Sequence, residues 1–364
     1  MVFAMQNSPK TLILVWGGTG WHAFPLLNLT KYLQKNIATS QSSLLSKYSF
    51  RWIWEADSIE SRLAEENGIF FSAIICGKLR RYFSPKTLLL PFQVLIGIIQ
   101  SFIILIDDKP MAIFSKGGYV SLPVAIAGWI LRIPVYLHES DSIPGLANRL
   151  VAHFATGIWS SFSEADTFFA PEKILGHGSL LSQNIVEIVK KSLEIQPKTQ
   201  LLVSCGSQGS SAIFDVLLEL LNTRYSVLGS MDIHLVLGMK NPQYREKFEK
   251  FQNVTIYDFF YDQDEYLKVV RKCDLVIARS GSSVFEFEAL WLHMILVPHP
   301  HTGNNHQYWN AMAFEKKGHE CIPQENLAKE LPAVLEKYRD YKKSTDIPPL
   351  NLSIYEEISK KIIH

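Results

Sequence analysis

The stretch TLILVWGGTGWHAFP (11–25) decides the fold, and LLVSCGSQG (201–209) repeats its pattern in the second half of the chain. In each stretch, apolar residues with strand character lead into a glycine-rich turn, at 17–20 and at 206–209, and a segment with helical spacing follows. A strand, a glycine turn and a helix form the unit whose bare backbone amides receive phosphate. Two such units predict two α/β domains facing each other across a phosphate-bearing ligand.

Length and composition agree with two globular domains. The chain has 364 residues, of which 47% are hydrophobic and 20% charged, and a formal net charge of +1. This length allows each domain its own core, and a net charge near zero argues against nucleic acid as a partner. The four cysteines, Cys76, Cys205, Cys273 and Cys321, lie far apart. Their spacing predicts free thiols in a reducing cytoplasm.

Strand-like and helix-like segments alternate along both halves of the chain. The expected strands are 11–16, 50–54, 70–75, 111–114, 135–137, 156–159, 201–205, 233–237, 254–257, 275–278 and 295–298, and the expected helices are 22–34, 58–67, 88–100, 120–131, 147–154, 213–221, 263–270, 283–292, 306–316 and 351–362. This alternation predicts parallel sheets covered by helices on both faces. The change in composition at ILGHGSLL (174–181) predicts the linker between the domains.

The segment LLLPFQVLIGIIQSFIILI (88–106) contains 19 residues without a charge, which is long enough to span a bilayer. A spanning helix would put the first glycine turn and the rest of the chain on opposite sides of a membrane. Pro91, Gln93, Gln100 and Ser101 are also poorly suited to lipid. We therefore expect a buried or interfacial helix that runs into a core strand, with a true span as the alternative.

Basic and apolar side chains are mixed just before this segment. They are Lys78, Leu79, Arg80, Arg81, Tyr82, Phe83 and Lys86. A basic cluster beside exposed apolar side chains suits an anionic lipid surface. This pattern predicts peripheral attachment to the inner face of the cytoplasmic membrane, and the alternative is a core helix with a solvated basic loop.

Turns after strands of the first half carry candidate functional residues. His22 stands at the start of an expected helix, either as a base or phosphate contact or as a residue satisfied by its own backbone. Gly117 and Gly118 follow another strand and suit either an anion nest or a turn with positive φ. His138 and the glutamate after it do not begin a zinc motif of the His-Glu-x-x-His type, because residue 142 is Ser142.

In the second half, the RSGSS sequence (279–283) has small residues that let backbone amides approach a diphosphate. Glu286, one helical turn later, is placed to accept two hydrogen bonds from ribose hydroxyls, or to form a capping box with Ser283. Asp262 and Asp264 resemble an Asp-x-Asp metal pair, but their place at a helix start favours a dipole role. The histidines at 299, 301 and 306 match no established ligand spacing, so we expect no metal.

Taken in order, these segments resemble the MurG family of membrane-associated N-acetylglucosaminyltransferases, which convert lipid I to lipid II in peptidoglycan synthesis. The matching motifs span nearly the whole chain: GGTGWHAFP (17–25), KLRR (78–81), KGGYVSLP (116–123), IPVYLHES (133–140), PGLANRL (144–150), GSQG (206–209), RSG (279–281) and HQYWNA (306–311). The resemblance implies a GT-B fold, an α/β architecture of two Rossmann-like domains facing across a cleft. The implied domains are 1–178 with the C-terminal helix 348–364, which holds the acceptor and rests on the membrane, and 179–347, which holds UDP-N-acetylglucosamine.

The resemblance also implies roles for individual residues. His22 is the first choice of catalytic base and Glu139 the second. The residues implied to bind the donor are Thr19, Gly20, Asp141, Ser207, Phe260, Ser282, Ser283, Glu286 and Gln307. Those implied for the acceptor diphosphate are Gly17, Gly18, Gly117, Gly118 and Tyr119, and those for the membrane are Leu79, Arg80, Arg81, Tyr82 and Phe83. The implied reaction is an inverting transfer to a lipid-linked acceptor that needs no cofactor and no obligatory metal.

The chain departs from the family pattern at four places. Trp21 replaces a glycine, Asp141 an asparagine and Leu180 an arginine, and the segment between Gly281 and Glu286 is one residue short. A related transferase for another UDP-sugar or lipid acceptor, and a non-catalytic nucleotide-sugar-binding protein, therefore remain alternatives. A nicotinamide-dependent oxidoreductase would account only for the first glycine turn.

Overall fold

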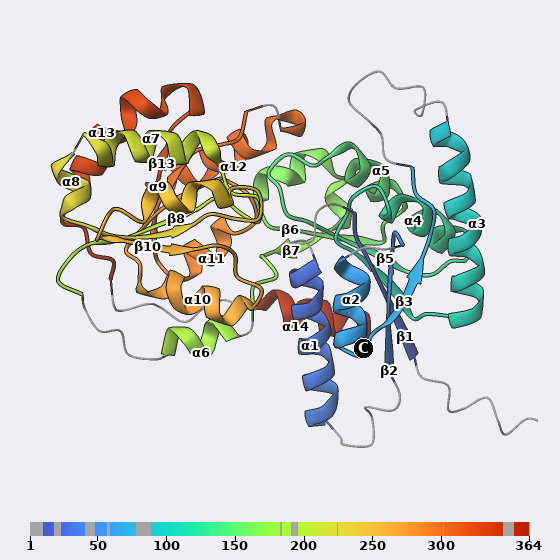
Figure 1. The fold of residues 1–364 in the computed structure, drawn as a ribbon. Coiled ribbons are helices and arrows are strands. Elements are labelled where there is room, and N and C mark those ends of the chain that lie inside the picture. Colours follow the sequence, from blue (N-terminus) through green and yellow to red (C-terminus); the bar gives the residue numbers. More distant parts are fainter. Residues whose placement is uncertain are drawn as a thin grey trace, which may run out of the picture. The chain divides into compact units, whose positions relative to one another are not determined.

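The computed structural model describes residues 10–17, 23–40, 48–56, 59–77, 89–182, 184–190, 196–223, 225–300, 302–344 and 353–363. The chain forms two compact units, one of residues 1–182 with 351–364 and the other of residues 183–350 (Figure 1). These divisions fall close to the boundaries expected after residues 178 and 347.

The first unit contains a seven-stranded sheet in the order β3-β2-β1-β4-β5-β6-β7, and every neighbouring pair is parallel. Its strands are β1 (Lys10–Val15), β2 (Tyr48–Trp54), β3 (Phe70–Ala73), β4 (Ala112–Ser115), β5 (Val135–Glu139), β6 (Gly157–Ser160) and β7 (Ile174–His177). Its α-helices are α1 (Ala23–Ser40), α2 (Ile59–Glu66), α3 (Leu90–Asp108), α4 (Ser121–Ile130), α5 (Leu146–Phe154) and α14 (Ser353–Ile363). The C-terminal helix α14 groups with the first unit.

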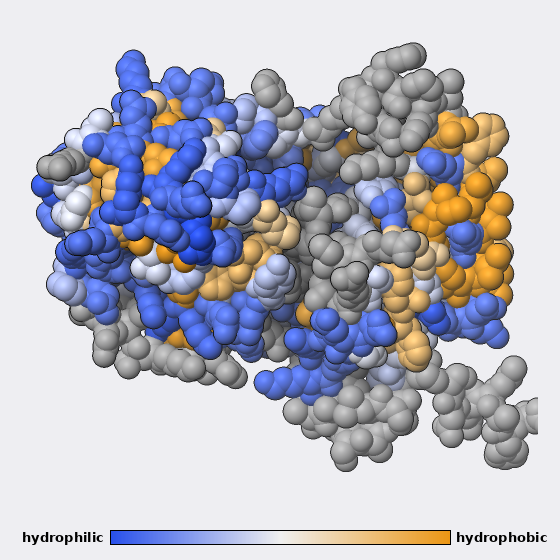
Figure 2. Space-filling view, in the orientation of Figure 1, coloured by the Kyte–Doolittle hydropathy of each residue, from blue (hydrophilic) through white to orange (hydrophobic). Residues whose placement is uncertain are grey.

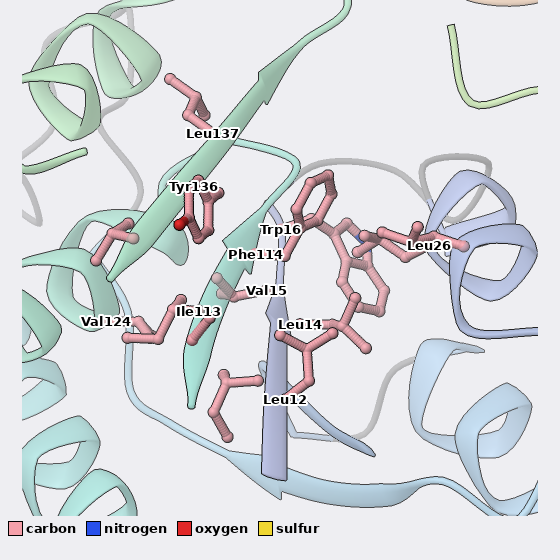
Figure 3. Close-up of a cluster of buried hydrophobic side chains, with 14 of the residues drawn as sticks. Leu12, Leu14, Val15, Trp16, Leu26, Ile113, Phe114, Val124, Tyr136 and Leu137 are labelled. Atoms are coloured by element: carbon pink, nitrogen blue, oxygen red, sulfur yellow. The ribbon is translucent and has the colours of Figure 1, made fainter. Parts of the chain in front are cut away.

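Helices cover both faces of this sheet, which is why its central strands are apolar along their length. In β1, every residue from Thr11 to Val15 is buried. Leu26 of α1 and Val124 of α4 lie on opposite sides of the central strands (Figure 3). A strand buried on both faces loses the apolar–polar alternation of a half-exposed strand and reads as a continuous apolar run.

The second unit repeats the plan with six parallel strands in the order β10-β9-β8-β11-β12-β13. Its strands are β8 (Gln200–Ser204), β9 (Asp232–Val236), β10 (Val254–Tyr257), β11 (Leu275–Ala278), β12 (His293–Leu296) and β13 (Glu320–Cys321). Its α-helices are α6 (Asn184–Lys190), α7 (Ser211–Asn222), α8 (Ser226–Gly229), α9 (Arg245–Phe248), α10 (Gln263–Lys272), α11 (Val284–Ala289), α12 (His306–Glu315) and α13 (Leu327–Lys337). Of these elements, α6, α8, α9, α13 and β13 were not expected from the sequence.

The expected linker at 174–181 is wrong in its first half. Residues Ile174–His177 form β7, the edge strand of the first sheet, which pairs with β6. Leu180 is buried in the core of the same unit. The crossing to the second unit therefore comes after residue 182.

The segment 88–106 is also different from our expectation. From residue 90 on, it forms a continuous helix, α3, that runs to Asp108, and only Gly97, Ser101 and Leu105 are buried along this helix. The small residues Gly97 and Ser101 let α3 approach its neighbours closely, since a Cβ on Gly97 would lie 3.2 Å from Pro123 of α4. The opposite side of the helix exposes apolar side chains. The prediction of a buried helix ending near Gln100 is therefore wrong, and the interfacial alternative is considered below.

Candidate functional site

The strand order reverses once in each sheet, between β1 and β4 and between β8 and β11. In open parallel sheets, ligands bind beyond the carboxyl ends of the strands at such a reversal. Gly17 follows β1 and Gly117 follows β4, while Gly206 follows β8 and Gly281 follows β11. The glycine-containing loops singled out from the sequence therefore stand in pairs, one pair at the reversal point of each sheet.

At the first reversal point, the loops after β1 and β4 touch through their backbones. Gly118 has φ +87°, and a Cβ on it would lie 2.1 Å from the carbonyl oxygen of Gly17. A Cβ on Gly17 would lie 2.6 Å from the amide nitrogen of Tyr119. Both positions thus require glycine, Gly118 for its backbone angle as well as for space. The other candidates of the first loop, Gly18, Thr19, Gly20 and His22, lie outside the described residues.

The two glycine amides of the second loop are already hydrogen-bonded within the protein. Gly117 N donates to Ser115 Oγ at 3.0 Å, and Gly118 N donates to Asn148 Oδ1 at 2.8 Å. Neither amide is free to receive a phosphate in this structure, which differs from the expected anion nest. The positive φ of both glycines, the other reading of the sequence, is observed.

Tyr119 is braced from another strand. Its hydroxyl donates to Glu55 Oε2 at 2.6 Å, and Glu55 directly follows β2. This bond links the loops that follow two strands of the sheet, so the position of Tyr119 depends on both.

Glu139, the second candidate base, is 1% exposed and accepts three hydrogen bonds. Its Oε1 accepts from the amides of Ser140 and Asp141 at 2.7 and 2.8 Å, and its Oε2 accepts from Asn148 Nδ2 at 2.6 Å. Burial raises the pKa of Glu139 to about 7. A base must reach the proton that it takes. The contacts of Glu139 instead hold the loop that carries Asp141 and, through Asn148, the amide of Gly118.

A buried chain of hydrogen bonds, which the sequence did not reveal, lies beside this loop. Lys116 Nζ is 2.9 Å from His138 Nδ1, and His138 Nε2 is 2.9 Å from the carbonyl oxygen of Gly178. Because the ammonium group only donates, His138 accepts at Nδ1 and donates from Nε2. Burial lowers the pKa of Lys116 to about 8, and burial and Lys116 together lower the pKa of His138. The chain connects the loop after β4 to the residue that follows β7.

Because Leu180 replaces an arginine of the family pattern, a neighbouring cation such as His177 or Arg279 is a candidate to carry that charge, but both side chains already have partners. His177 Nε2 lies 2.7 Å from Asp166 Oδ2. Arg279 donates within the second unit, as described next. The structure therefore contains no spare charge at either of these two positions.

At the second reversal point, the turn after β8 packs tightly against the end of β9. Gly206 and Gly209 both have φ +72°, and a Cβ on Gly209 would lie 1.9 Å from the carbonyl oxygen of Leu237. Met239 N donates to Ser207 O at 2.8 Å, which closes the turn. Within the described chain, the amides of Ser207 and its successor have no hydrogen-bond partner. This turn therefore offers free backbone donors, as a diphosphate site requires.

Arg279 ties this turn to the neighbouring loops. Its guanidinium donates to Ser210 Oγ at 2.7 Å and to Gln324 Oε1 at 2.6 Å. It also donates to the carbonyl oxygens of Val297 and Pro298 at 3.0 and 3.2 Å. The loops that follow β8, β11, β12 and β13 are thus held by one side chain.

The loop after β11 also has free donors. The amides of Gly281, Ser282 and Ser283 have no partner among the residues described. Ser283 makes no side-chain capping bond to α11, so the capping-box reading of Ser283 and Glu286 is wrong.

Glu286 is 9% exposed and bonds elsewhere. Its Oε1 accepts a hydrogen bond at 2.7 Å from Nε2 of Gln263, which lies in the first turn of α10. Burial raises the pKa of Glu286 to about 7, against the opposing effect of the Gln263 bond. The site thus contains a carboxyl group that changes charge near neutral pH. No local sequence pattern identifies Gln263 as the partner of Glu286.

Phe260 and Gln307 also lie beyond the carboxyl ends of strands. The ring centroid of Phe260 lies 5.0 Å from that of Tyr257 and 5.5 Å from that of Tyr266. The backbone amide and carbonyl of Phe260 have no hydrogen-bond partner in the described part of the chain. Gln307 Oε1 accepts a hydrogen bond from the amide of His299 at 2.9 Å. This bond fixes the side-chain amide, whose Nε2 group is the donor that can serve a ligand.

The Asp-x-Asp segment serves to start a helix, as the dipole argument predicts. Asp262 caps α10, accepting from Asp264 N at 2.7 Å, and Asp264 accepts from Asn184 Nδ2 at 2.6 Å. Among the described residues, no group of three or more His, Cys, Asp or Glu side chains is arranged to hold a metal ion.

Known proteins resemble both the sequence and the fold. The glycosyltransferase family 28 N-terminal domain matches residues 12–160, and the C-terminal domain of that family matches residues 200–351. A Bacillus cereus protein named UDP-N-acetylglucosamine–N-acetylmuramyl-(pentapeptide) pyrophosphoryl-undecaprenol N-acetylglucosamine transferase 2 is 32% identical over 321 residues, which cover 86% of each chain. A Clostridium botulinum transferase named for the same reaction is 33% identical over 346 residues, covering 91% of this chain and 93% of its own.

Solved structures share the fold at lower identity. The crystal structure of Acinetobacter baumannii MurG has a TM-score of 0.68 at 20% identity and covers 98% of this chain and 94% of its own. The UDP-GlcNAc 2-epimerase from Neisseria meningitidis bound to UDP-GlcNAc has a TM-score of 0.60 at 13% identity, with coverage of 96% and 100%. With its two parallel-sheet units and these matches over most of its length, the chain is a GT-B glycosyltransferase that belongs to family 28, among the MurG-type N-acetylglucosamine transferases.

Proposed function

We propose that this enzyme transfers N-acetylglucosamine from UDP-N-acetylglucosamine to the 4-hydroxyl of lipid I, undecaprenyl-pyrophosphoryl-MurNAc-peptide, and so makes lipid II for peptidoglycan. The observation that carries the proposal is the second reversal point, where free amides on two loops stand beside the buried carboxyl of Glu286. The names of the relatives supply the donor and the acceptor.

Each part of the donor has a candidate partner. The amides of Ser207, Ser282 and Ser283 suit the diphosphate, because unpaired backbone N–H groups bind phosphate oxygens without a metal. Glu286 suits the ribose hydroxyls, and the free backbone groups of Phe260 suit the polar edge of uracil. The sugar is assigned to Gln307, Asp141, Thr19 and Gly20, the last two of which lie outside the described residues.

The proposed chemistry is a single displacement with inversion. The acceptor 4-hydroxyl attacks the anomeric carbon, and UDP departs with the electrons of the broken glycosidic bond. A base takes the hydroxyl proton, and the donors around the diphosphate stabilise the charge that develops there. His22 is the proposed base, since Glu139 is buried and accepts three hydrogen bonds.

A thermal-shift panel tests the class of ligand directly. UDP and UDP-N-acetylglucosamine are expected to stabilise the protein, and at a hundredfold excess over Kd the effect is about 2.7 kcal/mol. UDP-glucose tests whether Asp141, in place of the family's asparagine, relaxes the choice of sugar. Stabilisation by NAD but not by UDP would contradict the proposal.

The first prediction concerns Glu286→Gln. This change should weaken UDP binding by about 1.5–3 kcal/mol, the scale of a hydrogen bond to a charged group. Because the pKa of Glu286 is about 7, UDP affinity of the unchanged protein should fall as the pH drops below 7, and the variant should lose this dependence. Calorimetric titration with UDP between pH 5.5 and 8.5 measures both effects.

The pH dependence of the stability of Glu286→Gln provides a second, ligand-free check on the state of this carboxyl group. The folded-state pKa of Glu286 lies above its ordinary value of 4.5, so the associated stability is present at low pH and is lost as the pH rises through about 7. Glu286→Gln removes this loss, so its melting temperature relative to the unchanged protein should be higher at pH 8 than at pH 6. Unchanged UDP binding in a folded variant would contradict the ribose assignment.

We also propose that the enzyme lies on the cytoplasmic face of the bacterial membrane through α3. This helix is long and apolar enough to cross a bilayer, and only Gly97, Ser101 and Leu105 are buried along it. Its uncovered side chains are Phe92, Leu95, Ile96, Ile99, Ile103 and Ile106, with exposed fractions from 42% to 65%. Figure 2 shows the hydrophobic surface gathered over α3.

The packing of α3 favours peripheral contact over a span. Gly97 and Ser101 face the body of the unit, and the last turn is held by the hydrogen bond from Arg51 Nη2 to Asp108 Oδ1 at 2.9 Å. A helix anchored along one side and apolar along the other fits a membrane surface. The basic residues predicted to meet anionic lipid, Arg80 and Arg81, and their neighbours Leu79, Tyr82 and Phe83 lie outside the described residues.

The second prediction tests this surface. Ile99→Asp and Ile103→Asp should each weaken vesicle binding by about tenfold or more, because a side chain such as Ile gains about 1.5–3 kcal/mol on leaving water. Flotation with anionic vesicles measures the effect, and neutral vesicles measure the electrostatic share. Trp291→Asp is the matched control, since Trp291 is 41% exposed on the second unit. Equal flotation of all variants would contradict the assignment, and resistance to carbonate extraction would favour a span.

A further inference from the structure

The carboxyl group of Glu286 is held on one side only. Its Oε1 accepts the hydrogen bond from Gln263 Nε2 at 2.7 Å. Its Oε2 has no hydrogen-bond partner in the part of the chain that the structure describes, and this oxygen is not completely enclosed by protein. One oxygen is therefore engaged by the protein and the other is left for a ligand.

Gln263 is itself firmly placed, because it is the first residue of α10 and that turn is anchored on both sides. Asp262 caps the helix by accepting from Asp264 N at 2.7 Å. Asp264 Oδ2 accepts from Asn184 Nδ2 at 2.6 Å, which ties the turn to α6. A side chain that starts from such a turn can hold its partner in one orientation.

Tyr266, one turn further along α10, adds a contact with the strand below the site. Its ring is buried, and its hydroxyl lies 2.9 Å from Ser204 Oγ at the end of β8. The first turn of α10 is therefore fixed to the same strand that leads into the phosphate-ready turn at 206–209.

The chemistry of the pair explains why a neutral amide is useful here. The terminal torsion of a glutamate side chain is broad, so a buried carboxyl without a partner would adopt several orientations. A cation in place of Gln263 would compete with the ligand for the carboxylate charge. An amide donor instead orients the group while leaving its charge available.

We propose that Gln263 is a positioning residue for ribose recognition: its amide orients Glu286 so that the second carboxylate oxygen accepts from a ribose hydroxyl. This inference rests on the proposed ribose role of Glu286. The inference also predicts a preference for ribonucleotides, because 2′-deoxyribonucleotides lack one of the two ribose hydroxyls that could donate to this oxygen.

The test compares UDP with 2′-deoxy-UDP by calorimetric titration of the full chain. Gln263→Met removes the donor at similar side-chain length, and Gln252→Met is the control at an exposed glutamine. Gln263→Met should weaken UDP binding about tenfold, within the range for a hydrogen bond to a charged group. It should weaken 2′-deoxy-UDP binding much less, so that the preference for the ribonucleotide shrinks.

A pH series separates positioning from a general structural role. The Gln263 bond favours the ionised carboxyl, so the midpoint of the acid loss of UDP binding should move to higher pH in Gln263→Met. Equal weakening of both nucleotides with an unchanged midpoint, or full UDP affinity in the folded variant, would overturn the inference. Failure of the unchanged protein to bind UDP, or full UDP affinity in Glu286→Gln, would instead overturn the proposed function.

Discussion

Replacing His22 by alanine is expected to lower kcat by about 10²–10⁴, the usual contribution of a general base. UDP affinity should stay unchanged, because the residues proposed above for the diphosphate, ribose and uracil belong to the second unit and His22 to the first. His22 lies outside the described residues, in the segment between Gly17 and Ala23. Gly17, two residues after the end of β1, lies against the backbone of Gly118, and α1 begins at Ala23, directly after His22 in sequence.

The measurement is a transfer assay with calorimetry of UDP binding on the same preparation. Glu139→Gln is the informative comparison, because Glu139 supports the loop through its hydrogen bonds to Ser140, Asp141 and Asn148. That variant should lose stability as well as turnover, whereas His22→Ala should keep its melting temperature. Near-normal transfer by His22→Ala would contradict the assignment of the base.

The strand–helix alternation was predictable because sheets buried on both faces need continuous apolar strands. Such runs stand out in the sequence at β1 and β8, and the second of the expected glycine turns, at 206–209, follows β8 as the sequence predicts. The edge strand β7 was missed and taken for a linker. Its sequence, ILGH, has two apolar residues and a glycine, and its residues are at most half-buried. A short strand paired on one side has no pattern to separate it from a loop.

The apolar helix shows a different limit. Composition alone does not tell whether an apolar side chain meets protein or solvent, and Ile103 and Leu105 are chemically similar although one is exposed and the other buried. The spacing of Gly97 and Ser101 was the available signal for the packed side. Small residues four positions apart mark the side of a helix where another backbone approaches closely.

The polar partners within the site were not predictable. Gln263 reaches Glu286 over 23 positions, Asn148 reaches Gly118 over 30, and Arg279 meets its Ser210 partner over 69. Pairs so distant in sequence leave no local spacing to read. The sequence could therefore nominate the loops that carry the chemistry, but the fold was needed to find what holds them.

The turn at 206–209 offers a sharp test, because two glycines share one backbone angle but not the same surroundings. Gly206→Ala should reduce stability by about 1–2 kcal/mol, the cost of a left-handed conformation for a residue with a Cβ. At Gly206, with φ +72°, no atom lies within 4 Å of an added Cβ. At Gly209, with the same φ, an added Cβ would lie 1.9 Å from Leu237 O and 2.6 Å from Asn241 Nδ2.

Gly209→Ala must therefore displace backbone as well as adopt the unfavourable angle, and we expect a total loss of about 4 kcal/mol or more. The displacement would also move the amides of Ser207 and its successor, so UDP binding should fail in Gly209→Ala and survive in Gly206→Ala. Urea unfolding and UDP calorimetry on both variants measure these effects. Equal losses for the two variants would show that the turn relaxes freely, and that the close approach of Leu237 is not what requires glycine at position 209.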